Sequence, residues 1–177
     1  MREIITGYLE KEYSIEILKG LCPRSHTVKE IESDPILMAE IEKKRKDFSD
    51  IYNSDVPVLK GETWRDLPGW EKYSASSYGR IRLNKKDGSS EILKQYDVKG
   101  RYGYLKLQSD KKGINHTEYV YTLIAYAFLG KRKNDGKQVH HIDNNGYNCR
   151  PDNLILVDCE QHSAIHEFNC CIRKPTI

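Results

Sequence analysis

The chain has 177 residues, of which 38% are hydrophobic and 31% are charged. This length suits one modest domain with an appendage, and the composition is not charged enough to predict disorder. No stretch approaches the ~20 apolar residues of a membrane span and no secretory signal opens the chain, so we expect a cytoplasmic protein with no membrane partner. The five cysteines have no Cys-x-x-Cys spacing, which argues against a cysteine-ligated zinc site and favours reduced thiols.

The charge of the chain is unevenly divided. The net charge is +3, yet residues 1–60 carry 10 Lys and Arg against 12 Asp and Glu. Residues 80–133 carry 13 Lys and Arg against 5 Asp and Glu. A polyanion is the simplest partner for such a basic segment, although a solvated lysine-rich face would have the same composition.

Residues 1–58 are predicted to form a helical segment, because apolar residues recur at a helical period and Pro23 and Pro35 divide them into two or three helices. The stretch 17–28 could form a helix-turn-helix that reads DNA. The negative charge of the segment instead favours an accessory cap or a dimer contact. Residues 53–61 are predicted to be an extended connector.

Residues 62–130 are predicted to form a β-rich module. Alternating residues predict short strands at 78–83, 92–93, 104–107 and 117–120. Turns are expected at Lys86-Asp87-Gly88 and at Asp110-Lys111-Lys112-Gly113. An apolar helix over 121–129 should pack on this sheet. Trp64 and Trp70 are expected to serve packing rather than base stacking.

Four of the six histidines lie between residues 140 and 166. Imidazole both binds divalent metals and moves protons near neutral pH. Neighbours on a strand point to opposite sides, so His140 and His141 can divide two tasks, one facing a metal and one facing water. His162 and His166 share a helix face and could reach one ion. A structural zinc site of histidines is the alternative, but it gives no reason for the adjacent His141.

Two consecutive stretches resemble the phage and intron-encoded HNH homing endonucleases. Residues 64–82, from Trp64-Arg65-Asp66-Leu67-Pro68-Gly69-Trp70 to Gly79-Arg80-Ile81-Arg82, resemble the DNA-associated module found upstream of HNH cores, with Ala75 and Ser77 as mild departures. Residues 139–166 resemble the HNH core itself. The resemblance implies an α+β fold: a small antiparallel sheet and a ββα-metal core over 131–170, preceded by the helical segment.

The resemblance also implies the roles of the site residues. His140, His162 and His166 take metal-ligand positions, the last as in the toxin nucleases of the superfamily. His141 takes the position of the general base, and Asn153 holds the following loop and orients that base. One divalent ion is expected: Mg²⁺ or Mn²⁺ from the family, with Zn²⁺, Ni²⁺ or Co²⁺ also suited to imidazole.

Basic residues are the candidates for DNA contact: Arg80, Arg82, Lys94, Lys99, Arg101, Lys106, Lys111, Lys112 and Arg150. Arg80 and Arg82 share a strand face and are placed nearest the bases. Arg150 either contacts the scissile phosphate or is a surface arginine beside a Pro-Asp turn. The loop residues Asp143, Asn144, Asn145 and Asn148 are interpreted as structural, since Asn and Asp favour turns.

The sequence therefore predicts a metal-dependent endonuclease that cuts duplex DNA and is encoded by a phage or mobile element. The alternative is a catalytically degenerate HNH protein that binds DNA without cutting it. One metal and one base make one cut per protomer, so a monomer would nick and a homodimer could break both strands. Because the candidate ligands all follow residue 139, deletion of residues 1–55 is expected to leave the metal site competent.

Overall fold

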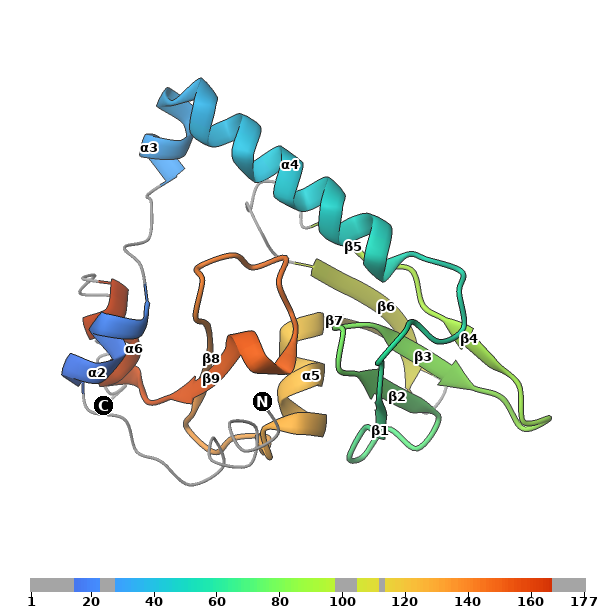
Figure 1. The fold of residues 1–177 in the computed structure, drawn as a ribbon. Helices are drawn as coiled ribbons and strands as arrows, with labels where there is room; N and C mark the ends of the chain where they lie inside the picture. Colours follow the sequence, from blue (N-terminus) through green and yellow to red (C-terminus); the bar gives the residue numbers. More distant parts are fainter. Residues whose placement is uncertain (1–14, 23–27, 98–104, 112–113, 167–177) are drawn as a thin grey trace.

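The protein is described here by a computed structural model covering residues 15–22, 28–97, 105–111 and 114–166 (Figure 1). Within these ranges the N-terminal segment forms the helices α2 (Ile15–Leu21), α3 (Val28–Ser33) and α4 (Pro35–Tyr52). Three antiparallel sheets, α5 (Val120–Phe128) and α6 (Cys159–His166) follow. The fold is therefore α+β, as the sequence predicted.

The start of α4 is fixed by its first residues. The side chain of Asp34 accepts hydrogen bonds from the backbone N–H groups of Ile36 and Leu37 at 2.9 and 3.2 Å, and Pro35 occupies the first turn, where its missing N–H is not needed. Pro35 thus begins a helix, which confirms the predicted division of the segment at that residue. No helix in the described ranges is long and apolar enough to cross a membrane. The suggested helix-turn-helix at 17–28 includes residues 23–27, which lie outside the described part.

The first sheet is a meander in the order β1-β2-β3-β4. Its strands are β1 (Trp64–Asp66), β2 (Tyr73–Ser76), β3 (Ile81–Asn84) and β4 (Ser90–Ile92). The strand predicted over 78–83 begins later, at Ile81, because the Ser76 hydroxyl accepts hydrogen bonds from the N–H groups of Tyr78 and Arg80 and holds a turn there. The predicted turn at Gly88 is confirmed, with a φ of 85° at that glycine.

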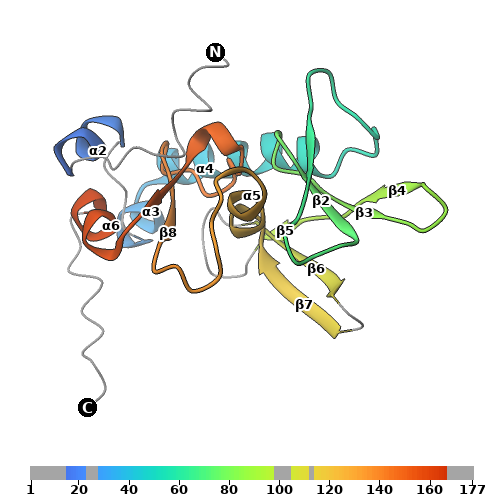
Figure 2. The same ribbon diagram turned by 90° about the horizontal axis from the view of Figure 1, so that it is seen from below.

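The second sheet has the order β5-β6-β7. Its strands are β5 (Tyr96–Asp97), β6 (Leu105–Lys111) and β7 (Ile114–Tyr119). β6 and β7 are longer than predicted, and their pairing runs from Lys106 opposite Tyr119 to Lys111 opposite Ile114. Of the predicted turn, Lys112 and Gly113 lie outside the described residues. β7 continues directly into α5, so the hairpin and this helix form one continuous piece of chain (Figure 2).

α5 lies at the centre of the main hydrophobic core. Val120, Leu123 and Ile124 are fully buried and belong to one cluster with Ala75 and Ile81 of the first sheet. Burying each leucine or isoleucine side chain contributes about 1.5–3 kcal/mol. The predicted helix over 121–129 is thereby confirmed with bounds one residue earlier, and it packs on the first sheet as expected.

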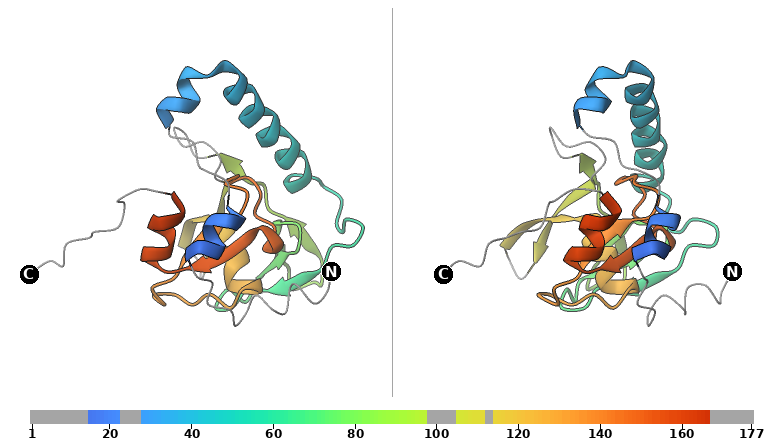
Figure 3. Two further views of the ribbon diagram at one scale, coloured as in Figure 1. Left: turned by 60° about the vertical axis from the view of Figure 1, so that its left-hand side comes forward. Right: turned by 90° about the vertical axis from the view of Figure 1, so that its left-hand side faces the viewer.

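The N-terminal segment packs on this core at two places. α2 lies beside α6 (Figure 3), where Leu18 is fully buried in a second cluster with Ile155, Val157 and Ile165. Tyr52, at the end of α4, is buried in the main cluster. Leu18 thus packs against the helix that carries His162, and deletion of residues 1–55 would remove this contact. That the metal site stays competent after the deletion remains a prediction.

A glycine at the junction of these parts gives a testable prediction. Gly79 has a φ of 80°, and a Cβ there would lie 2.9 Å from Cε1 of Tyr52 and 3.2 Å from the backbone of Cys149. Gly88 has a similar φ of 85° but nothing within 4 Å. Gly88→Ala should lower the free energy of unfolding by about 1 kcal/mol through backbone strain. Gly79→Ala should cost about 1–3 kcal/mol more through overpacking. Equal losses in urea unfolding would contradict this account of Gly79.

Candidate active site

A β-hairpin and one helix form the histidine-rich region. β8 (Gln138–His141) pairs with β9 (Leu154–Val157), with His140 opposite Ile155 and His141 opposite Leu154. Alternation along β8 sends the two imidazoles to opposite faces, as predicted. His140 lies against α6, at 5.5 and 4.8 Å between its ring centroid and those of His162 and His166.

The position of α6 is fixed by a reciprocal capping arrangement at its start. The N–H of Gln161 donates to the carboxylate of Asp158 at 2.8 Å, and the N–H of Asp158 donates to the side-chain carbonyl of Gln161 at 2.9 Å. Each pairing satisfies a backbone donor that the first helical turn leaves unbonded. This spacing, an acid followed three residues later by Gln, is readable in the sequence but was not among the predicted features. It fixes where α6 begins, with the capping Asp158 four residues before His162.

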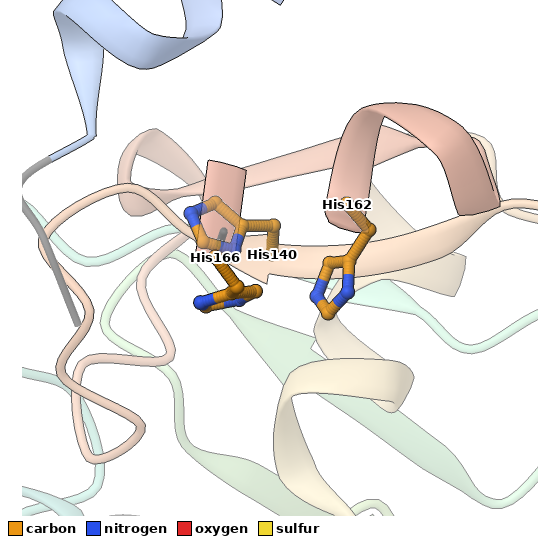
Figure 4. Close-up of side chains that lie close together, drawn as sticks. All are labelled: His140, His162 and His166. Atoms are coloured by element: carbon orange, nitrogen blue, oxygen red, sulfur yellow. The ribbon is translucent and has the colours of Figure 1, made fainter. Parts of the chain in front are cut away.

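Three imidazoles meet on one side of the hairpin, from β8 and from two successive turns of α6 (Figure 4). One ring nitrogen from each of His140, His162 and His166 lies within 4.8 Å of the others. The buried Nε2 of His140 has no hydrogen-bond partner. A buried polar atom without a partner lowers the stability of the fold unless a water molecule or an ion binds to it. This donor set fits a divalent metal ion.

The protonation state of the cluster also suits a cation. Burial, together with the neighbouring imidazoles, lowers the pKa of His140 to about 3. Burial and the adjacent His166 lower the pKa of His162 to about 4, and burial lowers the pKa of His166 as well. All three are therefore neutral at pH 7, and a neutral imidazole is the form that binds metals.

His141 lies on the other face of β8, against α5. Its ring meets that of Tyr121 edge-on, with 5.3 Å between centroids, and the side chain is 6% exposed. The expectation that His141 faces water is therefore wrong in this structure, because Tyr121 from the first turn of α5 covers it. Burial lowers the pKa of His141 to about 4, against an opposing effect of Asp143. A neutral imidazole can accept a proton, as a general base must.

Asn153 fastens the loop between β8 and β9. Its Oδ1 accepts from the N–H of Asp143 at 3.2 Å, while its Nδ2 donates to the carboxylate of Asp143 at 2.8 Å and to the carbonyl of Asn148 at 2.9 Å. Asp143 also accepts from the N–H of Asn145 and the side chain of Asn148. These bonds agree with the structural interpretation of the loop residues. The loop that leaves His141 is thereby tied to the residue that precedes β9.

Arg80 does not contact DNA in the way that the sequence suggested. It is fully buried, and its guanidinium donates to Glu62 at 2.8 and 2.5 Å and to the carbonyls of Ser54 and Val56 in the connector. Burial alone would raise the pKa of Glu62, but the hydrogen bonds from Arg80, Leu59 and Ser76 and the charge of Arg80 together hold that pKa below its usual range. The placement of Arg80 nearest the bases is wrong because the connector covers this end of the strand face.

The other candidate DNA contacts are differently placed. Arg82 is partly exposed, with its guanidinium carbon 4.5 Å from the Trp64 ring centroid, and Lys94 is exposed beyond β4. Arg150 is also partly exposed, with its guanidinium carbon 4.4 Å from the Tyr78 ring centroid. The backbones of Lys106 and Lys111 lie in β6. The remaining candidates fall outside the described residues: Lys99, Arg101 and Lys112.

The two tryptophans have packing roles, as expected. Trp70 is buried and meets the ring of Tyr73 edge-on at 5.8 Å between centroids. Trp64 is half-buried beneath the guanidinium of Arg82. Cys22 and Cys149 are buried thiols that form no disulfide. Burial raises the pKa of Cys149 far above its usual range, so this thiol stays protonated and acts as a packing residue.

The hairpin, the helix and the histidines between them define the ββα-metal class of nuclease domain. Comparison with known families agrees: residues 118–164 match the family model described as HNH endonuclease, and residues 62–121 match the NUMOD4 motif. The range matched by the HNH endonuclease model thus follows the range matched by the NUMOD4 motif, in the order that the sequence resemblance predicted.

Among solved structures, one of the HNH homing endonuclease I-HmuI, concerned with its DNA binding and cleavage, matches at 30% identity and a TM-score of 0.48. The match covers 56% of this chain and 55% of that chain, so the present chain spans little more than half of that protein. A comparison with curated proteins gave no match.

Proposed function

We propose that this protein is a metal-dependent endonuclease that hydrolyses phosphodiester bonds in duplex DNA. The observation that supports it best is that β8 carries two adjacent histidines that point to its opposite faces. His140 joins His162 and His166 in a cluster fit for a divalent ion, and His141 stands neutral on the opposite face. A structural histidine site would need the first of these features but not the second.

A divalent ion bound there would supply positive charge to the scissile phosphate and to the leaving oxygen. His140, His162 and His166 would hold it through neutral imidazole nitrogens. Burial lowers the pKa of His141 and keeps its ring neutral at pH 7, so it would accept a proton from the attacking water once Tyr121 moves aside to admit that water. Asn153 restrains the loop after His141, which limits the movement of the base. Arg150, partly exposed beside this loop, is suited to contact a phosphate oxygen.

The test of this function is incubation with supercoiled plasmid in Mg²⁺, Mn²⁺, Zn²⁺, Ni²⁺ or Co²⁺, with EDTA as the control. We expect cleavage in Mg²⁺ or Mn²⁺, and three imidazoles should accept the later transition metals too. Nicked product alone indicates a monomer that cuts one strand, and linear product indicates a homodimer. DNA binding without cleavage in any metal would favour the degenerate, DNA-binding alternative.

We also propose that the gene belongs to a phage or mobile element. The joint occurrence of the NUMOD4 motif and the HNH domain supports this origin, since the sequence resembles phage and intron-encoded nucleases in both parts. Its genomic context tests the proposal. A location among housekeeping genes, with no phage or intron sequence adjoining, would refute it.

Salt dependence of DNA binding tests the basic segment. If residues 80–133 neutralise about five to eight phosphates, the logarithm of the binding constant should fall against the logarithm of salt with a slope of about −0.9 per contact. Binding is measured in EDTA so that no cleavage occurs. Lys94→Ala should reduce the slope by about 1, whereas Lys43→Ala, an exposed change on α4, should leave it unaltered. A flat slope in the parent protein would mean that the segment is only a solvated face.

A further inference from the structure

Tyr52 joins the N-terminal segment to the loop between β8 and β9. It is fully buried at the end of α4, and it precedes both matched ranges, which begin at residues 62 and 118. Its hydroxyl donates to the carbonyl of Tyr147 at 2.6 Å and accepts from the N–H of Cys149 at 3.0 Å. The Cys149 N–H also donates to the Tyr147 carbonyl at 3.1 Å. A side chain 95 residues away along the chain thus binds both ends of this short backbone turn.

The loop is held on both sides of Asn148. Tyr52 binds the residues before and after it, and Asn153 binds the Asn148 carbonyl itself at 2.9 Å. The side chain of Asn148 returns to Asp143 at 2.9 Å, and the N–H of Asp143 donates to Asn153. One connected set of hydrogen bonds therefore runs from Tyr52 through the loop to Asn153, beside His141.

The ring of Tyr52 has little freedom to move. Phe48 stacks on it with 5.8 Å between centroids, and Gly79 approaches so closely that a Cβ there would lie 2.9 Å from its Cε1. Burial raises the pKa of Tyr52 well above its usual range, so the hydroxyl keeps the proton that it donates to Tyr147. A fixed ring with a protonated hydroxyl is a rigid support for the loop.

We propose that Tyr52 is a positioning residue of the nuclease site, supplied by the segment that precedes the NUMOD4 motif. It acts on the reaction through the loop, by keeping Asn153 and the strand end at His141 in register, and it touches neither metal ligands nor DNA. This inference rests on the proposed nuclease function. Residues that orient a catalytic or metal-binding group typically change activity by about 10- to 100-fold when replaced.

Tyr52→Phe tests the proposal, because it keeps the packed ring and removes both hydrogen bonds. Ser74→Ala is the matched control: Ser74 is fully buried in the first sheet and its hydroxyl also makes two bonds, to Asp66 and from Asn84. In single-turnover plasmid cleavage, Tyr52→Phe should cut about 10- to 100-fold more slowly with metal and DNA binding unchanged. Ser74→Ala should lose stability but not rate. Equal rates in the two variants would overturn the proposal.

A double-mutant cycle tests whether Tyr52 and Asn153 act through one loop. Tyr52→Phe should have little effect on rate in the Asn153→Ala protein, because residues of one network are not additive. If the losses in cleavage rate of the two single variants add up in the double variant, Tyr52 and Asn153 do not act through one loop.

Amide hydrogen exchange separates this proposal from the nuclease function itself. Tyr52→Phe should speed exchange at Ile142 and Asp143, whose N–H groups bond to Asn153, and not at residues of β2. If the parent protein cuts no DNA, the proposed function fails while this measurement still reports on the support given by Tyr52. Faster exchange at Cys149 alone would show that the effect stops at the lost bond, which would refute a role in positioning.

Discussion

Replacing His141 with alanine is expected to abolish DNA cleavage while metal binding and DNA binding persist. Proton abstraction by a positioned base contributes about 10²–10⁴-fold to the rate. Cleavage can be lost without loss of metal binding because neighbouring side chains of β8 point to opposite faces. His141 contacts Tyr121 on the face away from the three-histidine cluster. Plasmid cleavage and calorimetry with Mn²⁺, performed on the same preparation, measure the two properties independently.

Chemical rescue provides the control for this variant. The alanine leaves a space beside Tyr121 in which added imidazole can replace the missing base, so cleavage should recover in part with imidazole concentration. Loss of Mn²⁺ binding in His141→Ala would show instead that the change disturbs the cluster on the other face. Cleavage within a few-fold of the parent rate would remove His141 from the role of base.

The histidine cluster could be predicted from sequence because the features that build it are local. A strand sends neighbouring residues to opposite faces, and a helix sends residues four apart to the same face. His140, His162 and His166 therefore meet once the hairpin and helix exist. The burial of His141 depends on Tyr121, which reaches it from a different element. No periodicity around residue 141 contains that information.

Arg80 shows the corresponding limit for charged residues. The alternation that places Arg80 and Arg82 on one strand face is real, since both guanidinium groups lie near the ring of Trp64, at 5.6 and 4.5 Å. The sequence does not show that the connector and Glu62 cover Arg80 and leave Arg82 partly exposed. Arginine on a strand face was interpreted as a DNA contact, and for Arg80 a buried ion pair replaces that contact.

Tyr52 could not be predicted as part of the site. Its bonds to Tyr147 and Cys149 span more than ninety residues, and the helix that carries it ends in an ordinary amphipathic pattern. The Tyr52 hydroxyl bonds to a carbonyl and an N–H that also bond to each other, and no pattern near residue 52 indicates where that turn lies.

The second large effect is expected at the metal ligands. His140→Ala and His162→Ala should each lose metal affinity by about 100-fold or more, since even residues behind the ligands cost 10- to 100-fold, and should lose cleavage with it. His166→Ala should be milder if water or a phosphate oxygen replaces it. A bound ion stabilises the folded state by about 2.7 kcal/mol at a concentration of 100 times its Kd. Thermal unfolding with and without Mn²⁺ or Zn²⁺ therefore measures the loss without any DNA.

The pH dependence of this stabilisation gives an independent test of the cluster. The pKa of His140 is lowered to about 3 and that of His162 to about 4, both below the usual 6.5 of histidine. The unfolded chain therefore takes up protons first as the pH falls below 6.5, and the folded state loses stability through that window down to about pH 4. In the folded protein His140 and His162 stay neutral, so metal binding through them should persist at pH 5.5 and fail only as the pH approaches 4. Unchanged metal affinity in His162→Ala, or metal release already near pH 6.5, would contradict the assignment of these imidazoles as the ion's ligands.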